Sequence, residues 1–418
     1  MPRILHLGCG NFHRAHQAWY TDRAGGWTIT GVAMRSRAVP DALNPQNGDY
    51  TLVTQDTGGT DYARITCIDR VLFAPDEAQA ALDLIADPET HIVSLTITEK
   101  GYHLKGDGSL DVDAAAIAAD LVGTAAPKTA IGLLAHGLSK RTTPLTVLCC
   151  DNLTDNGTRL RGAVTAFADA ANMGWDAKVT FPNAMVDRIT PATTDALRED
   201  VAQETSWNDA APVATEAFSE WVIEDSFAGP RPDWHRVGVQ IVDDVAPFEK
   251  RKLRMLNGAH SAMAYGGILR GHTYVHQAVD DPVLRDLAIG VMAEAATTLP
   301  DGMDPDSYAD SLLTRWENTA LDHALRQIAM DGSQKLPMRL VATTQELDGH
   351  APASTQGIAA WIAFAKSETE AGRALDDPAA GTIAAACESE DPIGGLCAVL
   401  GVTPALFGGP EALTLSWE

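Results

Sequence analysis

Short apolar runs alternate with segments of helical spacing through the first part of the chain. A run of roughly four to eight apolar or β-branched residues is typical of a buried strand, and an alanine-rich segment with an apolar stripe is typical of a helix. This alternation predicts an α/β fold built on an open sheet. The predicted strands cover residues 4–7, 27–33, 50–54, 92–97, 145–149, 179–186 and 237–242, and the predicted helices cover 75–87, 114–122 and 130–140.

Helical spacing dominates the later part of the chain, most clearly at residues 281–296 and 307–327. No internal repeat or low-complexity stretch interrupts it. We therefore predict two domains, an α/β domain at residues 1–245 and a mostly α-helical domain at residues 246–418. The final stretch, 370–418, is rich in alanine, glycine and acidic residues and predicts no chemistry.

Polar residues that could take part in chemistry are concentrated at 247–260. This segment reads P-F-E-K-R-K-L-R-M-L-N-G-A-H and is predicted to form one α-helix. An α-helix advances about 100° per residue, so with Lys252 at zero, Glu249 lies near 60° and His260 near 80°. Asn257 lies near 140° on the same count. The four polar groups are thus predicted to share one face, turned toward a cavity.

This set of side chains fits the oxidation of an alcohol without a metal ion. A partly desolvated lysine such as Lys252 has a lowered pKa and can take a proton from a hydroxyl. Asn257 could donate to the oxygen as charge develops, and His260 could bind a neighbouring hydroxyl. The alternative is a solvated surface helix, but the poor helix formers Asn257 and Gly258 in its middle favour the functional interpretation.

The composition excludes several classes of function. The 418 residues, 45% hydrophobic, allow more than one full core, and no apolar run is long enough to span a membrane. A net charge of −25 argues against nonspecific binding to nucleic acid or anionic lipid, so an anionic substrate would need a local basic pocket. The chain is expected to be a monomer or a small homo-oligomer.

The cysteines and the start of the chain point to a cytoplasmic protein. The six cysteines show no C-x-x-C spacing, which argues against structural zinc and against a disulfide framework. The chain begins M-P-R-I-L-H-L-G, without the pattern of a secretory signal. A reducing cytoplasm is therefore the expected compartment, and no metal is expected.

The first predicted strand leads into a glycine-rich loop, Gly8-Cys9-Gly10-Asn11-Phe12-His13-Arg14. The first two glycines of G-x-G-x-x-G let the backbone turn and approach a pyrophosphate, but His13 occupies the third position, so the motif alone is weak. The next predicted strand ends at Met34-Arg35-Ser36, without the acidic residue that NAD-specific Rossmann folds carry there. NAD is expected, and NADP stays open.

Several separated runs resemble the mannitol dehydrogenase family of long-chain polyol and uronate dehydrogenases. The pattern K-x-x-x-x-N-x-x-H at Lys252, Asn257 and His260 is similar to the catalytic segment of that family. Three further runs match it: H-L-G-C-G-N-F-H-R-A-H-Q-A from residue 6, T-E-K-G-Y from residue 98 and F-P-N-A-M-V-D-R-I-T-P from residue 181. The resemblance implies a Rossmann-type domain that binds NAD, followed by a helical substrate domain.

The resemblance also implies roles for single residues. Lys252 is the expected general base, Asn152 and Asn257 the two donors of an oxyanion hole, and His260 the group that orients the substrate. We further expect Glu249 to relay the proton to water. The expected cofactor-binding residues lie in two loops, namely Gly8, Gly10, Asn11, Phe12 and Arg14 in the first and Thr98, Glu99 and Lys100 in the second.

Two residues are expected to bind the substrate, and one is expected to be structural. Asp187 is a candidate acceptor for a substrate hydroxyl, and Lys335, after a D-G-S turn, is a candidate donor to an anionic or polyhydroxyl substrate. Arg188, next to Asp187, is expected to form a buried structural ion pair.

The substrate is expected to be a sugar acid. The run Q-I-A-M-D-G-S-Q-K-L-P from residue 327 resembles the fructuronate reductase (D-mannonate oxidoreductase) branch, whose substrates carry a carboxylate. That branch often has an arginine just before this run, where this chain has Asp322-His323-Ala324, and Tyr274-Val275-His276 resembles the mannitol branch. D-Mannonate and D-fructuronate are therefore expected, with mannitol or arabinitol as the alternative. A catalytically silent protein that binds a nucleotide and a sugar acid is the second alternative.

Overall fold

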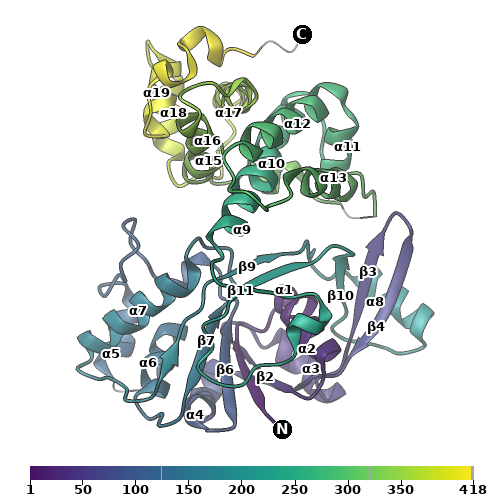
Figure 1. Cartoon of the computed structure of the whole chain (residues 1–418), viewed down its shortest axis with the longest axis vertical. Helices are drawn as coiled ribbons and strands as arrows, with labels where there is room; N and C mark the ends of the chain where they lie inside the picture. Colours follow the sequence, from purple (N-terminus) through teal and green to yellow (C-terminus); the bar gives the residue numbers. More distant parts are fainter. Residues whose placement is uncertain (124, 321, 416–418) are drawn as a thin grey trace. The chain divides into compact units, whose positions relative to one another are not determined.

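The computed structural model describes residues 1–123, 125–320 and 322–415. The chain divides into two compact units, Met1–Val245 and Ala246–Glu418, and each is described by itself (Figure 1). The first unit contains every strand of the described residues, whereas the described part of the second is built of helices. The predicted fold class, a Rossmann-like α/β part followed by a mostly helical part, is confirmed.

The main sheet of the first unit has the strand order β5-β2-β1-β6-β7-β8, and every neighbouring pair is parallel. Its strands end on the same edge of the sheet because they all run in one direction. Their bounds are β1 Arg3–Leu7, β2 Thr28–Ala33, β5 Ile68–Phe73, β6 Thr90–Leu95, β7 Leu145–Cys149 and β8 Val179–Thr180.

Apolar side chains cover both faces of this sheet, as the continuous apolar runs in the sequence require. Leu5 and Leu7 of β1 face a core that includes residues of α4, α5, α6 and α7. Ile4 faces the opposite side, where Trp221 and Trp234 join residues of α2 in a second core. The helices of this unit are α1 Asn11–Ala15, α2 Gln17–Ala24, α3 Ala38–Leu43, α4 Ala74–Ala86, α5 Ala115–Val122, α6 Ala130–Leu138, α7 Asn156–Ala170 and α8 Asp195–Thr205, with 3-10 turns η1 Asn44–Gln46, η2 Glu99–Tyr102 and η3 Trp234–Val237.

The direction of winding reverses between β1 and β6. From β1 the sheet grows through β2 to β5 on one side, and the chain then returns to place β6, β7 and β8 on the other side. In open α/β sheets the ligand binds beyond the carboxyl ends of the strands at this reversal. The loops that follow β1 and β6 therefore form the expected binding edge of the first unit.

Two smaller sheets correct the strand prediction. Residues 50–54 belong to a hairpin outside the main sheet, and 179–186 is not one strand, because Pro182 lacks the N–H that a ladder needs. The first half becomes β8, and the second half, β9, pairs antiparallel with β11. The smaller sheets are β10-β3-β4 and β12-β11-β9, with β3 Tyr50–Asp56, β4 Gly59–Ile65, β9 Ala184–Asp187, β10 Val213–Glu216, β11 Glu220–Glu224 and β12 Gln240–Val242.

Helix α10 is the core helix of the second unit, since every residue from 258 to 267 is buried and it packs against α12, α14 and α17. The predicted helix at 307–327 is shorter and ends at Trp316. The elements are α9 Ala246–Arg251, η4 Lys252–Leu256, α10 Asn257–Leu269, α11 Val275–Asp280, α12 Pro282–Ala296, α13 Pro305–Trp316, α14 Leu325–Ile328, α15 Gly332–Leu336, η5 Pro337–Val341, α16 Ala342–Glu346, α17 Pro352–Glu370, α18 Ala380–Cys387, α19 Pro392–Val399, η6 Pro404–Phe407 and η7 Pro410–Leu413.

A search of the described residues for a helix with the length and apolar character needed to cross a membrane finds none.

His13, in the third position of the glycine-rich motif, fills the space that a glycine would leave open. Its ring stacks on that of His6 in β1, with centroids 3.4 Å apart. Both side chains are fully buried, and each ring nitrogen of His6 lies 2.8 Å from a hydroxyl, that of Ser94 or Thr96. Burial lowers the pKa of His6 to about 3 and lowers that of His13 well below its usual value. Both rings are therefore neutral near pH 7.

These two histidines make the stability of the first unit depend on pH. Their folded pKa values lie below the unfolded value of about 6.5, so the unfolded chain binds more protons below that pH. The free energy of unfolding should fall as the pH falls below about 6.5, by about 1.4 kcal/mol per pH unit for each histidine. Urea unfolding of the wild type and of His13→Phe between pH 7 and pH 5 measures this. The variant should lose stability less steeply, and equal slopes would contradict the assignment.

Candidate active site

The loop after β1 approaches the loop after β6 so closely that only glycine fits at Gly8. Gly8 has φ +95°, and a Cβ there would lie 2.0 Å from the carbonyl oxygen of Thr96. The Thr96 hydroxyl donates to the Gly8 carbonyl oxygen at 2.8 Å. Gly10, by contrast, has no close neighbour, since the nearest atom to an added Cβ is 3.7 Å away. The bare backbone at Gly10 thus lies beside the reversal point of the sheet.

Asn11 and Arg14 fasten this loop to the rest of the unit. The Asn11 amide donates to the carbonyl oxygen of Pro191 at 3.2 Å and to the hydroxyl of Thr193 at 3.1 Å. Arg14 is buried and donates to Asn11 Oδ1 at 2.6 Å and to the carbonyl oxygen of Ala211. Arg14 therefore stabilises the conformation of the loop through hydrogen bonds on its buried side. Phe12 stacks on His16 at 5.1 Å, and this histidine ends α1 after five residues.

Asp151, directly after β7, clamps the loop that follows β6. Its carboxylate accepts the N–H groups of Ile97 and Thr98, both at 2.9 Å, and the hydroxyl of Tyr102 at 2.5 Å. Burial raises the pKa of Asp151, while these hydrogen bonds oppose that rise. Thr98 has φ +64°, a strained conformation for a β-branched residue and one that clusters at functional sites.

The clamp leaves a group of candidate residues exposed at the edge of the sheet. Thr98, Glu99 and Lys100 are all exposed in or next to the turn η2, and Asn152, next to Asp151, is exposed after β7. Since β6 and β7 are neighbours, the structure brings these residues to the same edge as the loop of Gly8 and Gly10. The sequence motifs predicted these residues as site residues, but not Asp151.

Asp187 and Arg188 are buried, and Asp187 ends β9. Among the described residues, the hydrogen bonds of Arg188 go to the main chain and not to the predicted carboxylate partner. Its guanidinium donates to the main-chain carbonyl oxygens of Ala15 and Glu216 and lies over the ring of Trp19 at 4.5 Å. Arg188 thus contacts the last residue of α1, Ala15, and the last residue of β10, Glu216.

In the second unit, the predicted helix at 247–260 contains a π-helical turn, and this corrects the predicted geometry. The N–H of Asn257 donates to the carbonyl oxygen of Lys252, an i→i+5 hydrogen bond. Residues joined in this way lie one turn apart, so Asn257 lies above Lys252 on the same side of the helix. The angle of about 140° expected from a regular α-helix is therefore wrong. Single π turns inside α-helices are frequent at functional sites.

The residues around this turn are buried or half-buried, as expected for proton transfer by a partly desolvated lysine. Lys252 is 8% exposed, Asn257 and Glu249 are half-buried, and His260 is 7% exposed. His260 and Ser261 follow Asn257 by three and four residues, so the three side chains share one face of α10. The structure therefore brings Lys252, Asn257 and His260 together along one side of a buried helix.

His260 belongs to a cluster of three rings, each of which has one buried nitrogen without a hydrogen-bond partner among the described residues. Its ring lies 5.0 Å from that of Trp316 and 5.5 Å from that of His323. In the part of the chain that the structure describes, His260 Nε2, His323 Nδ1 and Trp316 Nε1 are buried without a hydrogen-bond partner. Buried polar atoms are nearly always satisfied, so the cluster fits a ligand that carries several hydroxyl groups. Burial, and then the charges of His323, Arg315 and Arg339, lower the pKa of His260 well below its usual value.

Lys335 lies on the short helix α15, which leads into a second π turn, η5. The first residue of α15 has to be small, because a Cβ at Gly332 would lie 2.5 Å from the hydroxyl oxygen of Tyr265. Lys335 Nζ lies 3.8 Å from Asp331 Oδ2, and its side chain is 28% exposed. The turn η5 packs against η4, and Pro337, which lacks an N–H, begins it.

Arg339, in the middle of η5, is a candidate that sequence analysis missed. Its Nη1 donates to Ser261 Oγ at 3.0 Å and to the carbonyl oxygen of Asn257 at 3.5 Å. The guanidinium therefore lies against the face of α10 that carries Asn257. The available signal was its position four residues after Lys335, just beyond the run that resembles the uronate branch.

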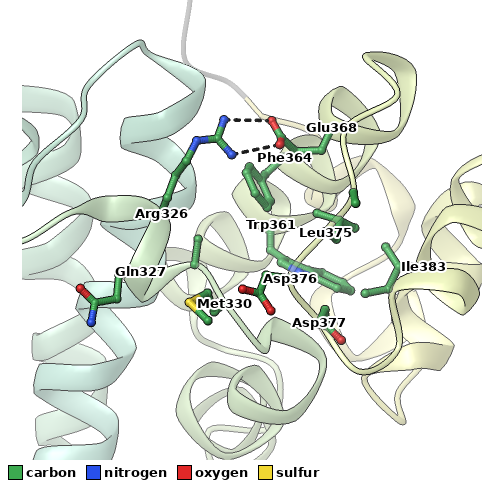
Figure 2. A pocket seen from close by; sticks show the side chains of 12 residues that line it. Arg326, Gln327, Met330, Trp361, Phe364, Glu368, Leu375, Asp376, Asp377 and Ile383 are labelled. Atoms are coloured by element: carbon green, nitrogen blue, oxygen red, sulfur yellow. Dashed lines mark hydrogen bonds and ion pairs between the residues drawn. The ribbon is translucent and has the colours of Figure 1, made fainter.

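A cavity of about 310 Å³ in the second unit has a different lining (Figure 2). Figure 2 shows Trp361 and Phe364 at this cavity, with Arg326 paired to Glu368 at its rim. Bonds from Arg373 and Arg326 lower the pKa of Glu368 to about 2. Segment 374–377, for which the sequence predicts no chemistry, completes the lining. None of the candidate catalytic residues lines this cavity.

Within residues 1–123, 125–320 and 322–415, no three histidine, cysteine, aspartate or glutamate side chains gather in a way that could hold a metal ion. The described cysteines are all free, and each except Cys387 is buried.

Two family models together match most of the chain. The model described as the mannitol dehydrogenase Rossmann domain matches residues 2–236, and the one described as the mannitol dehydrogenase C-terminal domain matches residues 244–395.

Individual relatives carry different substrate names. The mannitol 2-dehydrogenase of Phaeosphaeria nodorum is 40% identical over 405 residues, which cover 90% of this chain and 71% of that protein. The D-mannonate oxidoreductase of Escherichia coli strain K12 is also 40% identical, over 398 residues that cover 90% of this chain and 82% of that protein. Mannitol 2-dehydrogenase of Pseudomonas fluorescens, solved as a ternary complex with NAD and D-mannitol, superposes with a TM-score of 0.83 at 36% identity, covering 98% of this chain and 89% of that one.

The Asp151 clamp can be tested by hydrogen exchange. In Asp151→Asn, one of the two acceptor oxygens is replaced by an NH2 group, which cannot accept the N–H groups or the hydroxyl that the carboxylate binds. The loop should therefore lose about 2 kcal/mol of local stability. The amide hydrogens of Ile97 and Thr98 should then exchange at least about tenfold faster, as measured by mass spectrometry. The matched variant Asp155→Asn, four residues further along, should leave their exchange unchanged. Wild-type exchange in Asp151→Asn would contradict the clamp.

Proposed function

Because this chain belongs to the mannitol dehydrogenase family, we propose that this oxidoreductase of CH–OH groups interconverts D-mannonate and D-fructuronate with NAD. The observation that carries the proposal is the π turn, by which the buried Lys252 and the half-buried Asn257 lie on the same side of one helix. A base and a hydrogen-bond donor on one side can act on the same substrate oxygen.

We assign the proton transfer to the second unit. Lys252 Nζ takes the proton of the reacting hydroxyl, and Asn257 donates to the oxygen as negative charge develops on it. For Asn152, at the sheet edge of the first unit, we keep the role of oxyanion donor that the family resemblance implies. Glu249, one turn before Lys252, passes the proton on to water. In the reverse direction the ammonium group of Lys252 returns a proton to the carbonyl oxygen.

Substrate orientation is assigned to His260, Asp187 and Lys335. His260 stays neutral because of its lowered pKa, so its free ring nitrogen can bind a hydroxyl without adding charge. Asp187 is assigned to a second hydroxyl, and Lys335 to the polar end of the substrate. The ring cluster of His260, Trp316 and His323 supports a polyhydroxylated substrate, since it offers several buried polar atoms.

The first unit has two features of a dinucleotide-binding domain. The winding reverses between β1 and β6, and the backbone at Gly10 is open beside that point. We therefore assign cofactor binding to Gly8, Gly10, Asn11 and Phe12, with Arg14 supporting the loop, and to Thr98, Glu99 and Lys100 on the clamped turn. NAD held by these residues would supply the hydride acceptor for the oxidation of the alcohol.

Mannitol is the second candidate substrate, because relatives that bear its name are as similar to the chain as the mannonate enzyme. A carboxylate is favoured by the position of Arg339 against the same helix face. NADH formation with D-mannonate, D-mannitol and D-arabinitol, each with NAD and with NADP, separates these alternatives. Binding of NAD without oxidation of any of them would instead favour a silent binding protein.

Lys252→Ala tests the general base. Removal of the amine should lower kcat at least about 100-fold, because a positioned base contributes typically two to four orders of magnitude. The dissociation constant of NAD, measured by fluorescence titration, should change less than about threefold. Lys250→Ala is the matched control, since Lys250 lies on the same helix but binds Glu346 and the carbonyl oxygen of Thr298. Normal turnover in Lys252→Ala would reject the assignment.

A further inference from the structure

The second unit brings positive charge to one face of α10 from distant parts of the sequence. Arg339 reaches this face from η5 and is fixed there by the buried hydroxyl of Ser261 at 3.0 Å and the carbonyl oxygen of Asn257. Arg315, at the end of α13, is near enough for its charge to lower the pKa of both His260 and His323. The arginine that the resemblance leads one to expect near residue 322 is thus replaced by arginines from other elements.

The positive charge at this helix face contrasts with the negative net charge of the whole chain. The chain carries a net charge of −25, which repels anions at long range. A small anionic substrate therefore needs cations at the place where it binds. A guanidinium group is suited to this because it is always charged and can donate two parallel hydrogen bonds to a carboxylate.

The spacing along α10 separates two kinds of contact. Asn257 and Ser261 lie one turn apart, and Arg339 spans them on one flank. His260, between them in sequence, turns toward Trp316 and His323 on the other flank, where the buried ring nitrogens lack protein partners. One flank thus offers a fixed cation and the other offers groups for hydroxyls.

We propose that Arg339 binds the carboxylate of the sugar acid and so determines the preference for an aldonate over a polyol, an inference that rests on the proposed function. The hydroxyl groups of the same substrate then lie along the ring cluster of His260, Trp316 and His323. Ser261 fixes the guanidinium in advance, so that little conformational freedom is lost on binding. The chemical class recognised is a linear polyhydroxylated monocarboxylate.

The other explanation of these contacts is structural. Arg339 could serve only to hold the main chain at Asn257, and its loss would then impair every substrate equally. The two explanations differ in how a charged and an uncharged substrate respond, since only a carboxylate depends on the positive charge.

The test compares Arg339→Gln, Arg339→Lys and the wild type on D-mannonate and on D-mannitol, its uncharged counterpart. Each substrate is followed by NADH formation, and mannitol is also measured as an inhibitor of mannonate oxidation. In Arg339→Gln, kcat/KM for mannonate should fall by about 30- to 100-fold, as expected for a hydrogen bond to a charged group. The value for mannitol, or its inhibition constant, should change less than about threefold. Arg339→Lys keeps the charge and should recover part of the mannonate activity.

The control variant is Arg285→Gln, which removes a half-buried arginine of the same unit that pairs with Glu317 at 2.7 Å. It should leave both substrates unaffected. An equal loss on mannonate and mannitol in the Arg339 variants, or no loss on either, overturns the proposal while leaving the proposed function intact. If Arg339→Gln does not fold, as judged by circular dichroism, the same comparison is made with Arg339→Lys. The quantity that decides is then its loss of kcat/KM on mannonate relative to its loss on mannitol. Absence of wild-type activity on mannonate would instead reject the proposed substrate and this inference together.

Discussion

The hydrogen bond from the Asn257 N–H to the Lys252 carbonyl oxygen sets the geometry on which the second unit depends. In a regular α-helix, residues five apart point in clearly different directions, and the lysine and the asparagine could not serve one substrate atom. The i→i+5 bond widens one turn and returns the asparagine to the side of the lysine. The helix is otherwise buried and regular, so the position of each side chain is fixed by packing against α12, α14 and α17.

Both units position their candidate residues by contacts between segments that are distant in sequence. In the first unit, Asp151 at the end of one strand fixes the strained turn at Thr98 after the neighbouring strand. In the second, η5 packs against η4 and places Arg339 on the face of α10. Neither arrangement leaves the functional groups on a free loop. Such preorganisation is what a hydride-transfer site needs, because misplacement by about 1 Å can cost about 100-fold in rate.

The sequence predicts the parts of this molecule that local rules decide. Apolar runs predicted the parallel strands, and the strand order then followed the general rule for nucleotide-binding sheets. The candidate residues after β1, β6 and β7 were named mainly from motifs that resemble the family, and they lie at strand ends, where ligands bind in open α/β sheets. The π turn was not predictable, since K-L-R-M-L has ordinary helix propensity and tertiary packing decides its register. Asp151 and Arg339 were missed for a related reason, because their partners lie 53 and 78 residues away.

The central claim is that Lys252 and Asn257 act on one substrate oxygen, and a double-mutant cycle on kcat/KM tests it most directly. Lys252→Ala, Asn257→Ala and the double variant are compared with the wild type for the substrate that the wild type oxidises best. Groups that act as a unit give strongly non-additive losses, so the double variant should lose much less than the product of the two single losses. Losses that multiply would show that the two residues act independently, and this would contradict the account.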